Sequence, residues 1–377
     1  MTNGSRRKRL FLLATGLLTL AILAGCTGPS NGQNTLKPAG EEAQKIDDLF
    51  TFVMVIVALV FILVTVGTIV AAVKFRARPG RDDRPKQTHG NTALEVGWTL
   101  LPAVILAVVA VPTVSLIFQL NDPAEKGALE VTAVGKQWWW QFDYPAQSKG
   151  DAQVVTANEL HVPVGREVKM TLRACDPSLP GECNVIHSFW VPELNGKRDV
   201  VPGRENTLTF TAKEEGTFLG QCAEYCGLSH ANMRFRVIVQ SEREFERWLA
   251  QQQEGPAVTL DGAGRAGVLF SQTYGCTNCH TTEDSSLSSY GPNLTHLASR
   301  STFASGYYPL NRQNLIAWIL DAPSMIPMES KECRLGLGVP GVTCVGMPSF
   351  VNDTPPGQPT MTQAQAAQIA DYLLQLD

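Results

Sequence analysis

The pattern of hydrophobic and polar positions divides the chain into three kinds of segment. Two apolar runs, 50–73 and 96–118, contain no ionisable residue, and each can cross about 30 Å of hydrocarbon. Between Leu129 and Val239 apolar and polar residues alternate in short runs separated by Pro and Gly, which is typical of a β-sandwich or barrel. From residue 264 onwards the spacing becomes helical, and Thr362 and Gln365 form a capping pair for a last amphipathic helix.

The two apolar runs predict a transmembrane hairpin over 46–120. The loop that joins them is cationic, and it carries Lys74, Arg76, Arg78, Arg81, Arg84 and Lys86. Short cationic loops remain on the cytoplasmic side of a bacterial inner membrane. Both ends of this multi-pass segment, and the domains that follow, are therefore expected on the outer face.

The first 25 residues predict a removable signal peptide. A basic stretch, Arg6–Arg9, precedes an apolar stretch that is too short to span a bilayer comfortably. The segment ends in Leu-Ala-Gly before Cys26, which resembles a bacterial lipobox, so that cleavage would leave Cys26 as a lipid-modified N-terminus. The alternative is a retained hydrophobic anchor with an ordinary cysteine. Residues 26–45, rich in Gly, Pro, Ser and Asn, are expected to form a flexible linker.

Length and charge limit the remaining possibilities. A chain of 377 residues can hold about two or three domains. The net charge of −4, without a basic patch laced with aromatic residues, excludes a nucleic-acid-binding protein. A capped helix that begins at Ser241 and Glu244 is expected to close a β domain over 128–253, and a linker leads to a third domain over 264–377.

The densest chemistry lies between Gln221 and Met233. Two thiols, an imidazole and a thioether occur within twelve residues, with a carboxylate between the thiols; they belong to Cys222, Glu224, Cys226, His230 and Met233. Sulfur and imidazole ligands select copper or zinc, and a methionine favours copper. A structural zinc site or a disulfide between the two cysteines is the alternative, although zinc usually needs a second Cys or His pair. The spacing alone leaves copper and zinc about equal.

The upstream sequence His187-Ser-Phe-Trp and the segment 194–204 extend this motif. Together with C-x-E-x-C-x₃-H-x₂-M they resemble the dinuclear CuA domain of cytochrome c oxidase subunit II. The resemblance implies a cupredoxin Greek key in which Cys222 and Cys226 bridge two coppers. It also implies the remaining ligands, namely terminal His187 and His230, weak axial Met233, and the backbone carbonyl of Glu224.

The same resemblance gives roles to residues outside the loop. It implies that electrons enter at Trp138, the first of three adjacent tryptophans, which cannot all face a core because neighbours on a strand face opposite sides. We expect exposed aromatic surface beside the metal, and packing of Trp139 and one flank is the alternative. Glu95 is either an interfacial residue or lies by a proton channel of subunit I. The Glu224 carboxylate is expected to reach Mg²⁺ at the subunit I contact, and Asp199 and Arg204 lie near that contact or form a surface ion pair.

A second redox motif begins the third domain. Cys276-Thr-Asn-Cys279-His280 has the spacing of a covalent haem c site, with His280 as an axial ligand. A redox C-x-x-C with a chance histidine is the alternative. The segment 291–294 resembles the loop of class I cytochromes c in which a proline carbonyl orients that histidine, here Pro292. The resemblance implies an all-α class I cytochrome c domain.

The second axial ligand of the haem has three candidates. Met347 is preferred because Met347-Pro-Ser-Phe resembles the ligand loop of class I cytochromes, and Met328 is the alternative. Met325 follows a helix predicted over 314–321 too closely. Four remaining cysteines are expected to pair outside the cytoplasm as Cys175–Cys183 and Cys333–Cys344. The other histidines are expected in loops or on the surface (His89, His161) and near the haem edge (His296).

The resemblance implies an electron-transfer subunit II of a respiratory haem–copper oxidase with a fused cytochrome c. Electrons would pass from a cytochrome c or a bc-type complex to haem c, to CuA and to a haem of catalytic subunit I, with subunit III as a further partner. A quinol oxidase subunit lacks the copper ligands, and a copper-delivery protein would lack the second span and the haem motif. A CuA-bearing nitric oxide reductase subunit is the alternative, because the difference lies in the catalytic partner.

Overall fold

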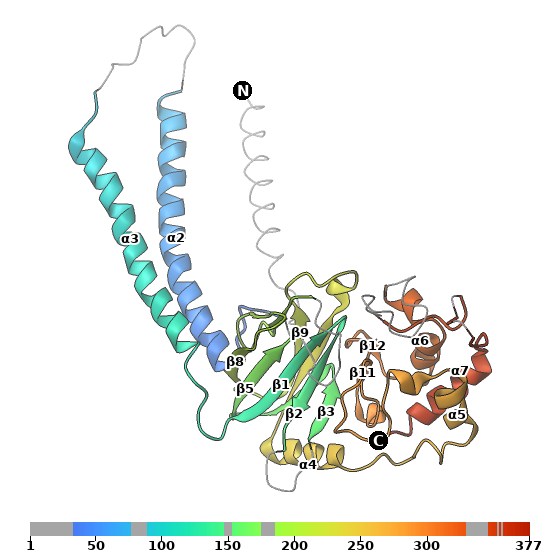
Figure 1. Cartoon of the computed structure of the whole chain (residues 1–377). Helices are drawn as coiled ribbons and strands as arrows, with labels where there is room; N and C mark the ends of the chain where they lie inside the picture. Colours follow the sequence, from blue (N-terminus) through green and yellow to red (C-terminus); the bar gives the residue numbers. More distant parts are fainter. Residues whose placement is uncertain are drawn as a thin grey trace, which may run out of the picture.

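The computed structural model describes residues 33–76, 89–146, 153–174, 185–328, 346–352, 354–355 and 357–377. These residues form a helical hairpin, a β-sandwich below it and a small, mainly helical domain beside the sandwich (Figure 1). Several predictions fall outside the described residues: the signal peptide 1–25, lipidation of Cys26, and the disulfides Cys175–Cys183 and Cys333–Cys344.

The hairpin consists of α2 (Glu41–Lys74) and α3 (Thr92–Gln119). Both helices are long and apolar enough to cross a membrane, and their apolar side chains are exposed over most of their length. The side chain of Asn91 starts α3 by accepting hydrogen bonds from the backbone N–H groups of Ala93 and Leu94. The two predicted apolar helices are confirmed, and both extend beyond the apolar runs.

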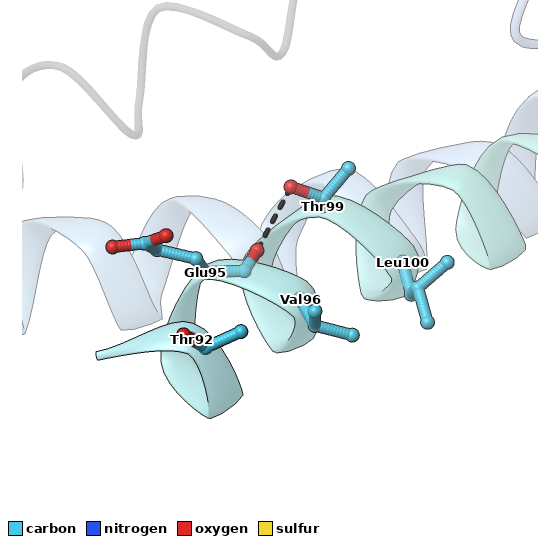
Figure 2. Close-up of a pocket in the computed structure, with 5 residues that line it drawn as sticks. All are labelled: Thr92, Glu95, Val96, Thr99 and Leu100. Atoms are coloured by element: carbon cyan, nitrogen blue, oxygen red, sulfur yellow. Dashed lines mark hydrogen bonds between the residues drawn. The ribbon is translucent and has the colours of Figure 1, made fainter. Parts of the chain in front are cut away.

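Glu95 lies in the first turn of α3. Its neighbours on that helix line a shallow, open hollow, with Thr92, Val96, Thr99 and Leu100 around it (Figure 2). The Thr99 hydroxyl donates a hydrogen bond to the Glu95 carbonyl at 2.8 Å, while the carboxylate points away from the other residues drawn. Glu95 is exposed, so the proton-path role stays a prediction that needs the partner subunit.

The linker expected over 26–45 is wrong for its second half. Residues 33–40 run along the sandwich, where the Ala39 N–H donates to the Glu193 carbonyl at 2.7 Å. Gly40 lies so close to Leu194 that a Cβ there would come within 2.2 Å of its carbonyl oxygen. Glu42, already in α2, accepts a hydrogen bond from the Thr211 N–H at 2.9 Å. These contacts fix the start of α2 against the sandwich, and small residues at 39 and 40 permit the close approach.

The sandwich has two five-stranded sheets, which confirms the predicted all-β class. One sheet has the order β3-β2-β1-β5-β8, with strands Val154–Ala157, Trp139–Tyr144, Leu129–Lys136, Glu167–Arg173 and Asn206–Thr211. The other has the order β4-β10-β9-β6-β7, with strands Glu159–Pro163, Arg234–Gln240, Gly216–Cys222, His187–Trp190 and Arg198–Val200. β1 pairs in parallel with β5 and β4 with β10, and the other pairs are antiparallel.

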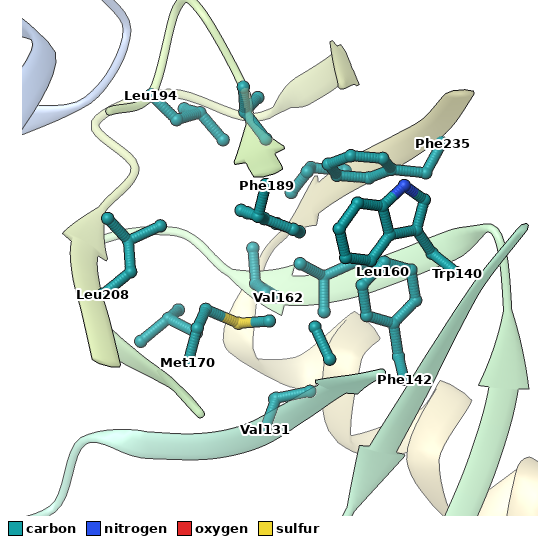
Figure 3. Packing of buried hydrophobic residues seen from close by; sticks show 14 of the residues in the cluster. Val131, Trp140, Phe142, Leu160, Val162, Met170, Phe189, Leu194, Leu208 and Phe235 are labelled. Atoms are coloured by element: carbon teal, nitrogen blue, oxygen red, sulfur yellow. The ribbon is translucent and has the colours of Figure 1, made fainter. Parts of the chain in front are cut away.

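Aromatic rings fill the centre of the sandwich (Figure 3). The rings of Trp140 and Phe189 meet edge to face at 5.4 Å, and Phe235 stacks on Phe189 at 4.7 Å. Trp139 points to the opposite side of β2, where the ammonium group of Lys136 lies 5.2 Å from its ring centroid. The three tryptophans therefore pack on different sides: Trp138 and Trp140 belong to the core cluster of the sandwich, and Trp139 does not.

The C-terminal domain follows α4 (Glu242–Gln253), which begins with the predicted capping box of Ser241 and Glu244. Its helices and turns are α5 (Arg265–Val268), a π-helical turn η2 (Leu269–Thr273), η3 (Cys276–Asn278), η4 (Leu297–Ser299), α6 (Arg312–Met325) and α7 (Gln363–Leu373). α6 is kinked at Asp321, where the helix predicted over 314–321 was expected to end. One feature was not predicted in an all-α domain, the hairpin of β11 (Thr302–Phe303) and β12 (Tyr308–Pro309).

Candidate metal centre

The predicted copper ligands meet at one end of the sandwich. His187 is the first residue of β6 and Cys222 the last residue of β9, and the register of these strands pairs Phe189 with Cys222. The chain then loops through Cys226 into a short 3₁₀ turn, η1 (His230–Asn232), before Met233 leads into β10. Adjacent strands therefore bring the distant histidine to the cysteine loop.

The donor atoms surround the two sulfurs. The Sγ atoms of Cys222 and Cys226 lie 3.8 Å apart. Around Cys222, the Nδ1 of His187 lies at 3.8 Å and the carbonyl oxygen of Glu224 at 3.2 Å. Around Cys226, the Nδ1 of His230 lies at 3.6 Å and the Sδ of Met233 at 3.7 Å. Each thiol thus has one imidazole and one weaker donor, which suits two metal ions bridged by the thiolates.

The two thiols are buried and share a hydrogen bond. That bond from Cys226 is the main reason why the pKa of Cys222 falls to about 3, and contacts with His187, Ser188 and Glu224 add to it against the cost of burial. The same bond, together with burial, raises the pKa of Cys226. Because thiolates are the ligands of soft metals, a bound metal would displace the shared proton.

A glycine of the facing sheet makes room for the first histidine. A Cβ at Gly135, in β1, would lie 2.8 Å from Cδ2 of His187, so any larger residue must displace the imidazole. Glycine inside a strand is otherwise unfavourable and often marks such a close approach. Sequence reasoning missed Gly135, although this rule could have found it.

Replacing Gly135 with alanine should lower copper affinity by about 10- to 100-fold while the sandwich remains folded, because the change disturbs the orientation of one ligand. Copper competition with a chelator measures the affinity, and circular dichroism reports the fold. Gly255→Ala is the matched control, since open space surrounds Gly255. Unchanged copper affinity in Gly135→Ala would show that His187 is not a ligand.

Trp138 lies directly behind the cysteine loop. Its Nε1 donates to the Cys226 carbonyl at 3.0 Å, and Nε2 of Gln137 donates to the same oxygen at 2.7 Å. The expectation that Trp138 forms exposed aromatic surface is wrong, because its side chain is only 9% exposed. The side chain belongs to the core cluster of the sandwich, and the C-terminal domain contacts its backbone, where Ser305 donates a hydrogen bond to the Trp138 carbonyl at 2.8 Å.

The outer side of the cysteine loop faces solvent. The Glu224 carboxylate is exposed and accepts only a local hydrogen bond from the Tyr225 N–H at 3.1 Å among those shown here. Tyr225 and Leu228 are 71% and 56% exposed. An exposed carboxylate in the same loop as an exposed tyrosine and an exposed leucine can contact a partner protein, and the Mg²⁺ role stays a prediction. Asp199 and Arg204 are exposed as well.

The second motif places His280 beside the predicted proline. Nδ1 of His280 lies 2.8 Å from the Pro292 carbonyl, which is the contact that the cytochrome resemblance implies. A Cβ at Gly291 would come within 2.5 Å of the same imidazole. Burial lowers the pKa of His280, so the ring is neutral near pH 7 and Nε2 is free to bind a metal. Cys276 and Cys279 occupy the preceding turn and are not joined by a disulfide.

The methionine candidates lie close to one another. The N–H of Met347 lies 3.3 Å from Sδ of Met328. Met347 packs with the C-terminal core, whereas Met328 packs against the core cluster of the sandwich. Met325 ends α6, where its carbonyl accepts a hydrogen bond from Tyr308. The partition between two cores favours Met347 for a haem held by the C-terminal domain.

The other histidines differ from expectation in one case. His161 lies half-buried in β4 rather than in a loop, stacks on Trp248 at 4.1 Å and has Nδ1 2.9 Å from Gln240 Oε1. His296 is buried, with Nε2 3.1 Å from the Glu254 carbonyl in the interdomain segment, while His89 is exposed. A histidine in a short strand gives no local signal of the aromatic residue that later packs on it.

The sequence matches two domain families that cover more than half of the chain. Residues 129–241 match the periplasmic domain, and residues 29–116 the transmembrane domain, of cytochrome c oxidase subunit II. A cytochrome c oxidase subunit 2 of Alkalihalophilus pseudofirmus is 38% identical over 321 residues, which are 83% of this chain and 88% of that protein. The chain belongs to the cytochrome c oxidase subunit II family.

Other relatives of this subunit II family member include quinol oxidases. A quinol oxidase subunit 2 of Bacillus spizizenii is 34% identical over 263 residues, covering 66% of this chain and 75% of that protein. The solved periplasmic domain of subunit II of cytochrome oxidase of Bradyrhizobium japonicum is 31% identical, with a TM-score of 0.29, and covers 34% of this chain and 95% of that one. The chain is thus a subunit of an oxidoreductase complex, a membrane protein with a periplasmic domain.

Proposed function

We propose that this subunit holds a dinuclear copper centre and a covalent haem c, and that it delivers electrons one at a time to the catalytic subunit of a haem–copper oxidase. The observation that carries the copper proposal is the set of four donors around two thiols 3.8 Å apart, six possible ligands in all. When bound, the copper pair would supply reversible one-electron chemistry without an open coordination position.

The chain's own residues keep that centre rigid and dry. Cys226, His187 and Met233 are buried, so water is excluded from most of the donor set. The carbonyl of Cys226 is held by two donors, Gln137 and Trp138. Fixed ligands favour electron transfer because little rearrangement accompanies a change of charge. A zinc site is the weaker candidate, since a thioether and a carbonyl beside two thiols fit copper better.

The haem proposal is supported by the second motif and by the relatives. The Pro292 carbonyl orients His280, and the thiols of Cys276 and Cys279 precede it. The match to the Alkalihalophilus oxidase subunit covers 83% of this chain. Residues 1–263 are too few to make up that share, so the match extends into the C-terminal domain. The quinol oxidase relative covers only 66%. When bound, the haem would supply a second one-electron centre.

The partners and the orientation follow from the same proposal. Catalytic subunit I would receive the electrons, subunit III would complete the complex, and a cytochrome c or a bc-type complex would donate. A lipid on Cys26 and outward-facing ends would hold both redox domains outside the inner membrane. The relatives found are named as oxidases, which favours oxygen over nitric oxide as the final acceptor.

The test is the composition of the purified complex. We expect two coppers and one covalent haem per subunit II, with a mixed-valence electron paramagnetic resonance signal shared between the coppers. Denaturing electrophoresis with haem staining should label this chain itself. One tightly bound zinc in place of copper would contradict the copper proposal, and an unstained chain would contradict the haem proposal.

Replacing Met347 with leucine should remove the sulfur-to-iron band near the red edge of the oxidised haem spectrum, because a leucine offers no donor to iron. Met328→Leu is the matched control and should keep the band, since Met328 packs on the sandwich. The opposite outcome would transfer the axial role to Met328.

A further inference from the structure

The unpredicted hairpin β11–β12 is one of the segments of the C-terminal domain that contact the sandwich, beside residues 285–289 and Pro327. Residues 301–307 contact four sandwich residues along this short segment. Ser301 and Thr302 bind Glu159, and Ser305 binds the carbonyl of Trp138. The carbonyl of Gly306 accepts a hydrogen bond from the guanidinium of Arg236. The guanidinium of Arg234 lies over the ring of Tyr307, 4.9 Å from its centroid.

Glu159 accepts most of the hydrogen bonds between the hairpin segment and the sandwich. Its Oε1 lies 2.9 Å from the hydroxyl of Ser301 and 3.1 Å from that of Thr302, and 3.2 Å from each of their backbone N–H groups. Only 4% of Glu159 is exposed. A buried carboxylate requires hydrogen-bond donors, and all four of these come from the other domain. The carboxylate therefore stabilises one docked arrangement.

The hairpin loop has a conformation that suits this contact. Ala304, Ser305 and Gly306 follow one another with φ values of 51°, 57° and 74°. Two of these residues carry a Cβ, which disfavours left-handed backbone, so surrounding contacts must hold the loop in shape. Ser305 lies at its centre and binds the Trp138 carbonyl. A left-handed backbone at Ala304 and Ser305 is thus a second observation, independent of the Glu159 bonds, that the interdomain contact fixes the conformation of this loop.

The docked domain touches the metal loop on two sides. On one side lies Ser305 at Trp138, whose indole binds the Cys226 carbonyl. On the other, the hydroxyl of Ser229, next to His230, donates to the carbonyl of Pro327, and Met328 follows. Figure 1 shows the C-terminal domain beside β2 and β3. The C-terminal domain therefore lies against the backbone of Trp138 and against the metal loop at Ser229.

We propose that Glu159 and the hairpin 301–307 form an interdomain clamp that closes the Trp138 surface to soluble electron-donor proteins. Glu159 is a positioning residue, and Trp138 serves the path between the two domains of this chain rather than an external donor. This assignment rests on the proposed function for its redox part. When bound, a haem held by Cys276, Cys279 and His280 would take one electron from the soluble donor, and a copper centre held by Cys222 and Cys226 would accept that electron as the haem is reoxidised, with no proton or bond exchanged.

The clamp is tested first without any redox measurement. A site-specific protease sequence is inserted after Gly255 in the full-length subunit, which is then cleaved within the assembled complex. The C-terminal fragment should remain bound, and Glu159→Ala should weaken its retention by about 10- to 100-fold, because several bonds to a charged group are lost. Ser301→Ala with Thr302→Val should have a similar effect from the other side.

Glu130→Ala is the control for this retention measurement. It removes an exposed carboxylate of the same sandwich, paired with Lys169 at 2.8 Å, and should leave retention unchanged. Equal retention in the wild type and both clamp variants would overturn the clamp, whatever cofactors the chain holds. Haem staining and copper analysis of the same samples show separately whether the proposed function holds.

The second measurement follows reduction by soluble cytochrome c. In the wild type the haem signal should change first and the copper signal only afterwards. In Glu159→Ala a direct phase of copper reduction should appear, and Trp138→Phe in the same background should slow this new phase by at least about tenfold, because the indole bond to the Cys226 carbonyl is lost. Direct, Trp138-dependent reduction of copper in the wild type would contradict a closed surface.

Discussion

Cys226→Ser should abolish copper binding in the full-length subunit and leave the sandwich folded. The Sγ of Cys226 lies within 3.8 Å of three other donors, which belong to Cys222, His230 and Met233. A serine hydroxyl is not a thiolate and binds soft metals poorly, so the bridge between two metal positions is lost. Serine is also smaller and close in shape, so the aromatic core beneath the loop should survive.

Copper analysis and the mixed-valence resonance signal measure this result together. We expect copper to fall from two per chain to none, or to one weakly held ion with an ordinary mononuclear signal. Tyr225→Phe in the same loop is the control, because Tyr225 is exposed and its ring is not a donor in the set. Two coppers retained in Cys226→Ser would show that the thiols do not bridge them.

Removing both thiols of the second motif should separate the two redox sites. In Cys276→Ser with Cys279→Ser we expect no covalent haem, unchanged copper, and a fall of at least about 100-fold in electron delivery from cytochrome c. The two domains have separate hydrophobic cores, so the sandwich should not depend on the haem. Loss of a bound group that stabilises only the folded domain should lower the thermal stability of the C-terminal domain.

Haem staining, copper analysis and calorimetry measure these three effects on one preparation. Tyr290→Phe, an exposed position near the motif, is the control and should keep haem and stability. Persistent covalent haem would show that other residues attach it. A simultaneous loss of copper would show that the domains fold as one unit.

Local sequence patterns were enough to predict most of the residues that meet in the candidate metal site. Five donors come from one loop, and their spacing is already written in residues 222–233. The sixth, His187, needs only the pairing of two neighbouring strands to arrive there. Capping at Ser241 and Thr362 was equally readable, because each cap depends on residues three positions apart. The alternation of apolar residues gave the class of the sandwich for the same reason.

Contacts between distant segments could not be predicted. The hairpin strands at 302–303 and 308–309 are two residues long and carry no periodic signal. The carbonyl of Trp138 accepts a hydrogen bond from Ser305 in another domain, and the N–H of Ala39 donates to Glu193 in a turn far along the chain. His161 was expected in a loop or on the surface, because no residue near it in the sequence indicates that Trp248 packs on its ring. In each case the deciding partner is remote in sequence.

The hydrogen bond from the Thr211 N–H to Glu42 fixes the distance between the start of α2 and the sandwich, and with it the height of the metal loop above the lipid. α2 has 34 residues and is therefore about 51 Å long, whereas hydrocarbon takes up only about 30 Å. Its first turns would then extend beyond the hydrocarbon as a rigid helical segment held against the sandwich. A thicker or thinner bilayer would then move this segment and the redox domains together, so that bilayer thickness tunes how far the metal loop stands from the catalytic subunit.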